Sequence, residues 1–219
     1  LLKNTALFLP SVCMTPCMEM TICHAWNINK DNKIYTLEYG LFPIRSQSNL
    51  CGTLLEHIYC LKRQQQFHTY VDNCQKLILR EKYISNRCKN IKEARNSVFY
   101  NGVMSSLATK FRITNDNQLN NFWINQLIHL INTSESIYNQ TITYIYKKNI
   151  NQIGIFNGRF FDSYALIKAA QKCNIEYFVY DINNKHLCFH NCSLHNIEEN
   201  QKRAKKFFNK NSKLHIDTG

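Results

Sequence analysis

The sequence predicts an α/β protein built on a Rossmann-like parallel sheet with a large helical insertion. Two observations support this prediction. Each end of the chain shows the pattern of an apolar strand, an amphipathic helix and a second apolar strand. Strand–helix–strand units of this kind form parallel sheets, and their crossover is right-handed almost without exception. The four strands are predicted over residues 5–9, 33–39, 153–156 and 175–180.

In the N-terminal unit, Pro10 and Ser11 form the turn after the first strand. A helix is expected from about residue 16 to 26, because its apolar residues recur at a spacing of four and share one face. Residues 33–39 alternate as a second strand, which ends at Gly40.

In the C-terminal unit, Asn157, Gly158 and Arg159 separate a strand from the next helix, which Asp162 or Ser163 can cap. The loop after the first strand of such a unit lies at the ligand-binding edge of an open α/β sheet. Glycine permits a tight turn, the following helix N-terminus offers free N–H groups, and arginine is a bidentate donor for phosphate or carboxylate. The alternative is a structural loop in which Arg159 pairs with a nearby carboxylate.

The region between the two units has no convincing strand, and we expect a helical insertion over about residues 54–148. Helices are predicted over 54–79, 91–111 and 117–148. The last of these would span ~48 Å if it were unbroken, so a bend is expected near residues 132–134.

The expected domain organisation is one Rossmann-like domain over residues 1–196. After a short strand at residues 186–190, residues 197–219 are expected to form a basic helix and linker that leads toward a second domain outside this chain.

Lysine and arginine outnumber aspartate and glutamate by 27 to 15, which gives a formal net charge of +12. This balance favours an anionic partner, whether a nucleic acid, a phosphate-bearing substrate or an acidic membrane surface, but it does not choose among them. No apolar run approaches the ~20 residues that cross a bilayer. We therefore expect a cytoplasmic protein, with peripheral attachment to the inner membrane as an alternative.

The ten cysteines are expected to be mostly reduced and buried, without a bound metal. The densest group of potential ligands is His186, Cys188, His190, Cys192 and His195. The first three point the same way on one predicted strand and Cys192 could join them, but alternate residues along a strand are too splayed for four zinc ligands. No Cys–His pair can be singled out as a nucleophile and its base. Glu19 and Glu38 are the carboxylates best placed at the carboxyl edge of the sheet, and a general base could be either or neither.

Several stretches resemble a known family. The run at 154–159, the alanine-rich helix ending at 169–175 and the pair Tyr180 and Asp181 resemble the "NGR" segment of bacterial capsule and surface-polysaccharide biosynthesis proteins. These proteins resemble two-domain GT-B glycosyltransferases. Residues 7–10, 51–60 and 204–210 are similar to the family's first strand, its cysteine-bearing segment and the helix that leaves its first domain. Asp181 departs from the family's glutamate at that position, which puts its reach in doubt.

The resemblance implies the N-terminal, acceptor-side half of an enzyme that transfers a sugar from a nucleotide-sugar donor to a glycan or lipid-linked acceptor. The donor would bind mainly the absent second domain, so this half alone is expected to be inactive. No metal or further cofactor is implied, and the basic surface would hold the enzyme on an anionic membrane. The catalytic candidates are Glu19, Glu38 and Asp181. The cleft edge would be formed by Pro10, Ser11, Gly40, Asn157, Gly158 and Arg159.

Two other classes of function remain open. A nucleic-acid-binding module would explain the charge, yet the sequence has no recognition-helix motif, no aromatic RNA-binding strand and no zinc finger, so no specific nucleic acid is expected. A scaffold module without catalysis is the other alternative. Neither the donor sugar nor the oligomeric state follows from the sequence.

Overall fold

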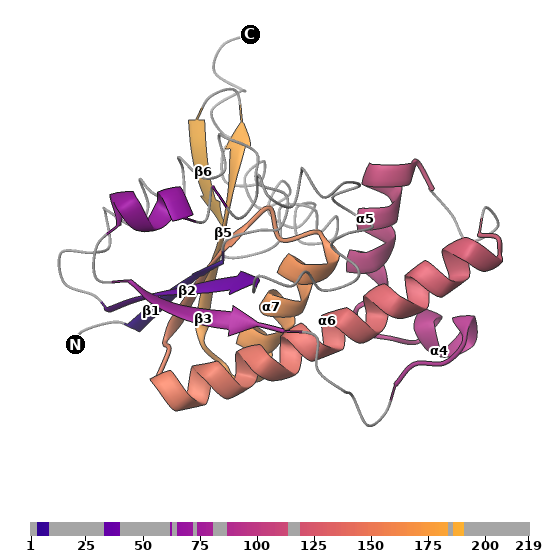
Figure 1. Cartoon of the computed structure of the whole chain (residues 1–219), viewed down its shortest axis with the longest axis horizontal. Helices are drawn as coiled ribbons and strands as arrows, with labels where there is room; N and C mark the ends of the chain where they lie inside the picture. Colours follow the sequence, from indigo (N-terminus) through magenta and orange to yellow (C-terminus); the bar gives the residue numbers. More distant parts are fainter. Residues whose placement is uncertain are drawn as a thin grey trace, which may run out of the picture.

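The structure, a computed structural model, describes residues 4–8, 33–39, 62, 65–71, 74–80, 87–113, 119–183 and 186–190. These residues form a six-stranded sheet with helices packed against it (Figure 1). The strands are β1 (Asn4–Phe8), β2 (Lys33–Tyr39), β3 (Gln75–Leu79), β4 (Gln152–Phe156), β5 (Glu176–Asn183) and β6 (His186–His190).

The sheet has the order β3-β2-β1-β4-β5-β6, and every pairing from β3 to β5 is parallel. β6 is antiparallel to β5. The predicted α/β class and Rossmann-like parallel sheet are therefore confirmed, as are the strands expected near residues 5–9, 33–39, 153–156 and 175–180. The chain winds outward in one direction from β1 and in the other from β4, which makes the gap between them the topological switch point.

β3 corrects the prediction of an insertion without strands. Residues 75–79 were expected to be helical, but they pair in parallel with β2, from Tyr35 opposite Gln75 to Tyr39 opposite Leu79. Leu77 and Leu79 are buried. A run of three apolar residues fits a helix end or a short strand equally well, and the hydrogen bonds to β2 decide in favour of the strand.

The two faces of the sheet have different neighbours. Ala6, Phe8, Leu37, Ile153 and Ile155 belong to one buried core with residues of the helical layer. That layer consists of α4 (Ile91–Arg95), α5 (Tyr100–Phe111), α6 (Asn121–Lys148) and α7 (Phe161–Lys172). Glu38 alternates with Leu37, so it lies on the other face, where it contacts a short helix at residues 65–70 through His68.

The helix predicted over residues 91–111 is two helices. α4 ends at Asn96, whose N–H bonds back to the carbonyls of Lys92 and Ala94, and α5 starts anew at Tyr100. In the connection, the Ser97 hydroxyl accepts a hydrogen bond from the Phe99 N–H at 3.2 Å. Hydrogen bonds of this local kind compete with those of a continuous helix.

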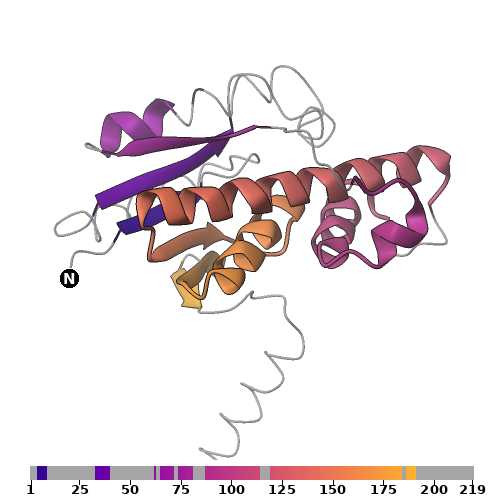
Figure 2. The same ribbon diagram turned by 90° about the horizontal axis from the view of Figure 1, so that it is seen from below.

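α6 is a single helix of 28 residues, and the bend predicted near residues 132–134 is absent (Figure 2). The hydroxyls of Thr133 and Ser134 donate to the carbonyls of His129 and Leu130, each four residues earlier, at 2.9 Å. The Asn132 side chain bonds to another segment. Because these polar groups find partners without interrupting the helix, it runs unbroken for about 42 Å.

α6 runs antiparallel to the strands and extends past the sheet. Its last turn lies at the amino edge, where the Asn4 side chain donates to the Lys148 carbonyl at 3.0 Å. Eight residues before the end of α6, Gln140 meets Arg80, which directly follows β3. The N-terminal half of α6 therefore projects beyond the carboxyl edge of the sheet, together with α4 and α5 (Figures 1 and 2).

The helix predicted at residues 16–26 and the basic helix and linker predicted over 197–219 lie outside the described residues. Within the described part of the chain, no helix is both long enough and apolar enough to cross a membrane.

Candidate functional site

The loop between β4 and α7 lies at the switch point and has an unusual backbone. Asn157 and Gly158 both have left-handed conformations, with φ of +62° and +73°. A side-chain Cβ at Gly158 would lie 2.9 Å from Cδ1 of Ile167 and 3.2 Å from Cγ2 of Val179. Only glycine fits this position without displacing the core, because both the conformation and the space exclude a side chain. The predicted tight turn is thus confirmed.

The N-terminus of α7 differs from the prediction, because its donors are used within the protein. Phe160 is the N-cap, while Asp162 and Ser163 lie in the first turn. The Phe161 N–H donates to the Ser106 hydroxyl at 2.9 Å, and the Ser163 N–H donates to Asp162 Oδ1 at 2.7 Å. We expected the N–H groups at this helix N-terminus to be free to bind an anion, and for Phe161 and Ser163 this expectation is wrong. Asp162 also adds negative charge to this turn.

Arg159 is the cation that the loop presents. Its side chain is half-buried, and its guanidinium carbon lies 4.9 Å from the ring centroid of Phe160, within the range of a cation–π contact. Among the described residues, its buried Nε has no hydrogen-bond partner. Arg159 thus places a guanidinium beside the β4–α7 turn, and such a group suits phosphate or carboxylate.

A second polar group lies at the end of β2. Glu38 is only 3% exposed, its Oε1 lies 2.5 Å from Nε2 of His68, and the Thr36 hydroxyl donates to the same oxygen. A buried carboxylate needs such partners, since an uncompensated charge would be strongly destabilising. The carboxylate in turn fixes the orientation of the imidazole, as acid–base and structural pairs both require.

The strand register relates this pair to the loop. Leu37 lies opposite Phe8, and Leu7 lies opposite Gly154, so Glu38 and Phe156 are at the same level on strands two apart. With neighbouring strands ~4.8 Å apart, their backbones are separated by about 10 Å. The Glu38–His68 pair and the β4–α7 loop therefore share one edge of the sheet.

Cys74 is a neighbour of this pair but a poor nucleophile. The pKa of the Cys74 thiol is raised to about 12, chiefly by burial; a hydrogen bond with Thr36 lowers it, and the Glu38 charge adds to the rise. The thiolate is the reactive form of cysteine, so Cys74 is inert at neutral pH.

The remaining candidates are placed only in part. Asp181 belongs to β5, one residue beyond the Phe156–Tyr180 pair, and its backbone therefore lies level with Asn157. β5 continues past the predicted end at Tyr180 because residues 179–183 pair with β6. The side chain of Asp181, and all of Glu19, Pro10, Ser11 and Gly40, lie outside the described residues. Among the described residues, no group of three His, Cys, Asp or Glu side chains is arranged to hold a metal ion.

His68 is the residue that sequence reasoning missed. It is 30 positions from Glu38, and its helix gives no sign of a buried carboxylate beside it. The buried polar residues of α6 were also misinterpreted. Their spacing of four, at Asn132, Ser136 and Gln140, on the apolar side of an amphipathic helix was the available signal.

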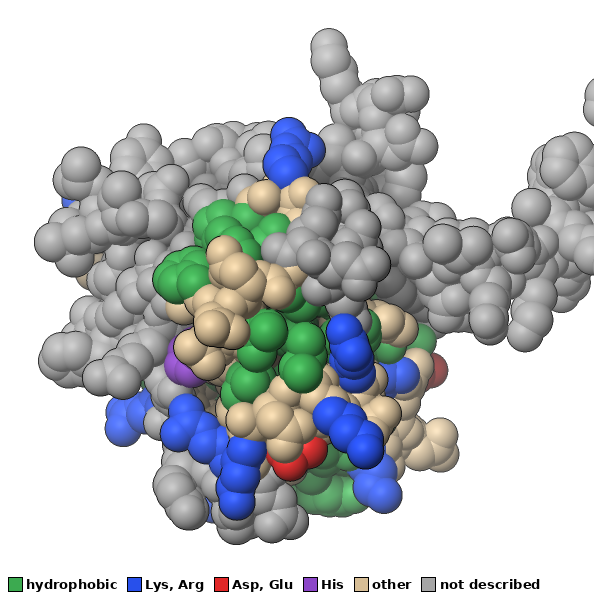
Figure 3. Space-filling view, turned by 90° about the vertical axis from the view of Figure 1, so that its right-hand side faces the viewer, with side chains coloured by type: hydrophobic (Ala, Val, Ile, Leu, Met, Phe, Trp, Pro, Cys, Tyr) green, Lys and Arg blue, Asp and Glu red, His purple; other side chains and the backbone are tan. Residues whose placement is uncertain are grey.

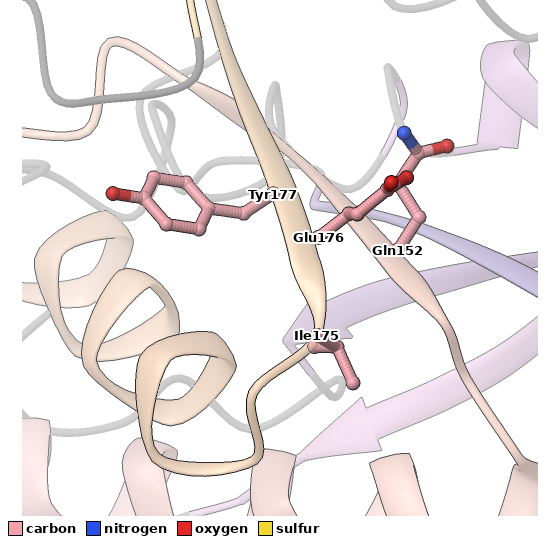
Figure 4. Close-up of a pocket in the computed structure, with 4 residues that line it drawn as sticks. All are labelled: Gln152, Ile175, Glu176 and Tyr177. Carbon is pink, nitrogen blue, oxygen red and sulfur yellow. The ribbon is translucent and has the colours of Figure 1, made fainter.

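A cavity of about 310 Å³ lies at the opposite end of the sheet (Figure 4). It is lined by Gln152, Ile175, Glu176 and Tyr177, at the amino ends of β4 and β5. Tyr177 points toward α7, away from Gln152 and Glu176. Ligands of open α/β sheets bind at the carboxyl edge, so this cavity is not the candidate site.

The side of the molecule beyond the carboxyl edge is basic. Residues 87–113, which contain α4 and α5, include six lysines and arginines and one glutamate. Figure 3 shows Lys and Arg side chains around a group of apolar side chains at this end. The side of the molecule toward which the candidate site opens therefore carries an excess of positive charge.

These features define an α/β protein with a Rossmann-like sheet and a candidate binding site at its switch point. No protein-family model matches the chain, and no curated protein matches it either. Among solved structures, it is similar to a CDPS (cyclodipeptide synthase) from Fluoribacter dumoffii, with a TM-score of 0.52 and 14% sequence identity. The likeness covers 85% of this chain and 90% of that one, and at this identity it shows the fold alone.

Proposed function

We propose that the protein is a transferase that binds an activated, anionic donor at the carboxyl edge of its sheet, between β1 and β4. The observation that carries this proposal is the left-handed Asn157–Gly158 turn at the switch point, followed by the half-buried Arg159, whose Nε has no hydrogen-bond partner among the described residues. Open α/β sheets bind their ligands at this place, and a guanidinium suits phosphate or carboxylate.

In this proposal, Arg159 neutralises the leaving group of the donor, and the Glu38–His68 pair serves the acceptor. Transfer to a hydroxyl or an amine requires a base that removes a proton from the attacking atom. Glu38 holds His68 by its Nε2, which leaves the other ring nitrogen as the candidate base. The backbones of Glu38 and Phe156 are about 10 Å apart along the carboxyl edge, so the pair and the β4–α7 loop could serve one donor and one acceptor.

The first candidate reaction is sugar transfer from a nucleotide-sugar donor. The resemblance of residues 154–159 and 169–175 to surface-polysaccharide biosynthesis proteins supports it. The chain would then be the acceptor-side half of a GT-B enzyme, with a glycan or lipid-linked acceptor and an anionic membrane as partners. A second domain would supply most of the nucleotide-sugar site.

The second candidate reaction is the formation of a cyclic dipeptide from two activated aminoacyl groups. It is favoured by the fold likeness to a cyclodipeptide synthase, which extends over most of both chains. The basic helices beside the carboxyl edge support it too, because aminoacyl groups are activated in cells as esters of a polyanion, transfer RNA. Such a donor would be bound through its phosphates, without recognition of its sequence.

One experiment tests the proposal and separates the two reactions. The purified chain is incubated with a panel of nucleotide sugars plus a lipid-phosphate acceptor, and separately with charged total transfer RNA, and products are identified by mass spectrometry. The sugar reaction is repeated with the full-length gene product. A glycosylated lipid supports the first candidate, and a cyclic dipeptide supports the second. A folded, full-length protein that makes neither product contradicts the transferase proposal.

A further inference from the structure

Two buried side-chain amides of α6 hold the two ends of the segment that follows β3. The Arg80 N–H donates to Gln140 Oε1 at 3.0 Å, and Gln140 Nε2 donates to the Arg80 carbonyl at 2.5 Å. Asn132 repeats this arrangement with Cys88. The Cys88 N–H donates to Asn132 Oδ1 at 2.8 Å, and Asn132 Nδ2 donates to the Cys88 carbonyl at 3.0 Å. Each amide thus binds both polar groups of one backbone residue.

The two amides form a rigid support. Asn132 and Gln140 are 4% and 6% exposed, and Ser136, between them, donates to the Arg80 carbonyl at 3.3 Å. Eight residues along an unbroken helix correspond to a rise of about 12 Å. Both amides must remain paired, because a buried amide without partners is costly. The distance between the backbones of Arg80 and Cys88 is therefore set by the helix.

One of the two held residues is an arginine, and an arginine precedes the other. Arg80 follows the last residue of β3 at the carboxyl edge, Arg87 precedes Cys88, and both arginines are exposed. Beyond them, the Asn90 and Glu93 side chains cap α4 reciprocally, and Glu93 also accepts the Lys89 N–H. Cations thus follow α6 from the carboxyl edge toward α4.

We propose that Asn132 and Gln140 are positioning residues that hold Arg80 and Arg87 for the phosphate groups of a polyanionic donor, of the chemical class of RNA. This inference rests on the proposed function, because the donor bound at the carboxyl edge is taken to carry that polyanion. Arginines on a fixed backbone lose less freedom on binding than arginines on an unsupported one, so the amides contribute to affinity without touching the ligand.

The test compares Gln140→Met and Asn132→Leu with Asn139→Leu, which removes an exposed amide of the same helix. Binding is measured by fluorescence anisotropy with a short labelled single-stranded RNA at two salt concentrations. Arg80→Ala and Arg87→Ala should each weaken binding, as expected for the loss of a phosphate contact. Gln140→Met and Asn132→Leu should weaken binding by about fivefold although both arginines remain, and Asn139→Leu should match the wild type.

Amide hydrogen exchange supplies a readout that needs neither donor nor turnover. The N–H groups of Arg80 in Gln140→Met and of Cys88 in Asn132→Leu should exchange about tenfold faster, while those of β4 and α7 are unchanged. The inference is overturned if the two variants bind RNA as tightly as the wild type. It is also overturned if the wild type binds vesicles of phosphatidylglycerol and no RNA. RNA binding that depends on both amides, with no transfer from any donor, would refute the proposed function and support this inference.

Discussion

At the scale of single residues, the candidate site depends on Gly158, a position that has no room for a side chain. Gly158 combines a left-handed backbone with close contacts to Ile167 and Val179. Asn174 also has a left-handed backbone, with φ of +52°, but its side chain is exposed. Substitutions at Gly158 change both the backbone strain and the packing, whereas substitutions at Asn174 change the backbone strain alone.

Gly158→Ala should lower the free energy of unfolding by about 2 kcal/mol or more, since a left-handed alanine costs ~1 kcal/mol before the clash with Ile167 is added. Urea denaturation followed by circular dichroism measures it. The matched change Asn174→Gly should be neutral within about 0.5 kcal/mol. An alanine variant as stable as the wild type would show that the β4–α7 loop differs from the conformation described here.

The Glu38–His68 pair makes a prediction about coupling. His68→Leu should destabilise the fold by about 3 kcal/mol, because it leaves the buried Glu38 carboxylate without its main partner. Glu38→Leu/His68→Leu should be more stable than His68→Leu alone, since the buried charge is gone. A double-mutant cycle from urea denaturation gives the coupling energy, and additive effects of the two changes would show that the pair is not formed.

Cys74 makes a prediction about pH. Burial raises its pKa from the ordinary 9.0 to about 12, so the folded chain keeps this proton at pH values at which the unfolded chain has lost it. The unfolded state then binds fewer protons, and the free energy of unfolding should fall as the pH rises above about 9. Urea denaturation at pH 8 and pH 10 should show a smaller fall for Cys74→Ser than for the wild type. Equal falls would contradict the burial of this thiol.

At the scale of elements, α5 packs against α7 through a position without a side chain. A Cβ at Gly102 would lie 2.7 Å from Cβ of Tyr164, which is too close for any real contact. The same helix pair joins the site to the core, because Ser106, one turn after Gly102, accepts the first N–H of α7. The distance between α5 and α7 thus determines whether the Ser106 hydroxyl can accept the first N–H of α7.

Gly102→Ala should destabilise the protein by about 1–3 kcal/mol, because α5 must move away from α7 to admit a methyl group. Its neighbour Asn101 is exposed, and Asn101→Ala should have little effect or stabilise the helix slightly. Thermal unfolding of both variants checks this pair. A Gly102→Ala variant that melts at the wild-type temperature would contradict the described contact between the helices.

The helices and strands also show which parts of the fold could be predicted from the sequence. Two strand–helix–strand patterns were enough to predict β1, β2, β4, β5 and their parallel arrangement, because hydrophobic periodicity is a local property. β3 was missed because its identity depends on pairing with β2, and the bend in α6 was wrong because Asn132 and Gln140 find partners in a segment more than 40 positions away. The turn at Gly158 was predictable from a glycine after a strand. The use of the α7 donors by Ser106 and Asp162 was not, since it depends on how α5 and α7 pack.

At the scale of the whole molecule, the switch point and the basic helices lie on one side. α6 connects them, because its C-terminal half packs along the sheet and its N-terminal half carries α4 and α5 past the carboxyl edge (Figure 2). An anionic donor held by Arg159 would therefore meet further positive charge from the residues beyond β3. This arrangement is the physical basis of the proposed transferase.

Arg159→Ala tests this central claim most directly, with transfer activity and melting temperature measured on one preparation. If Arg159 holds the donor, activity should fall by roughly tenfold to a hundredfold, equivalent to ~1.5–3 kcal/mol for a charge-assisted contact, while the melting temperature stays nearly unchanged. A destabilised variant whose folded fraction keeps full activity would contradict the claim and remove Arg159 from the site.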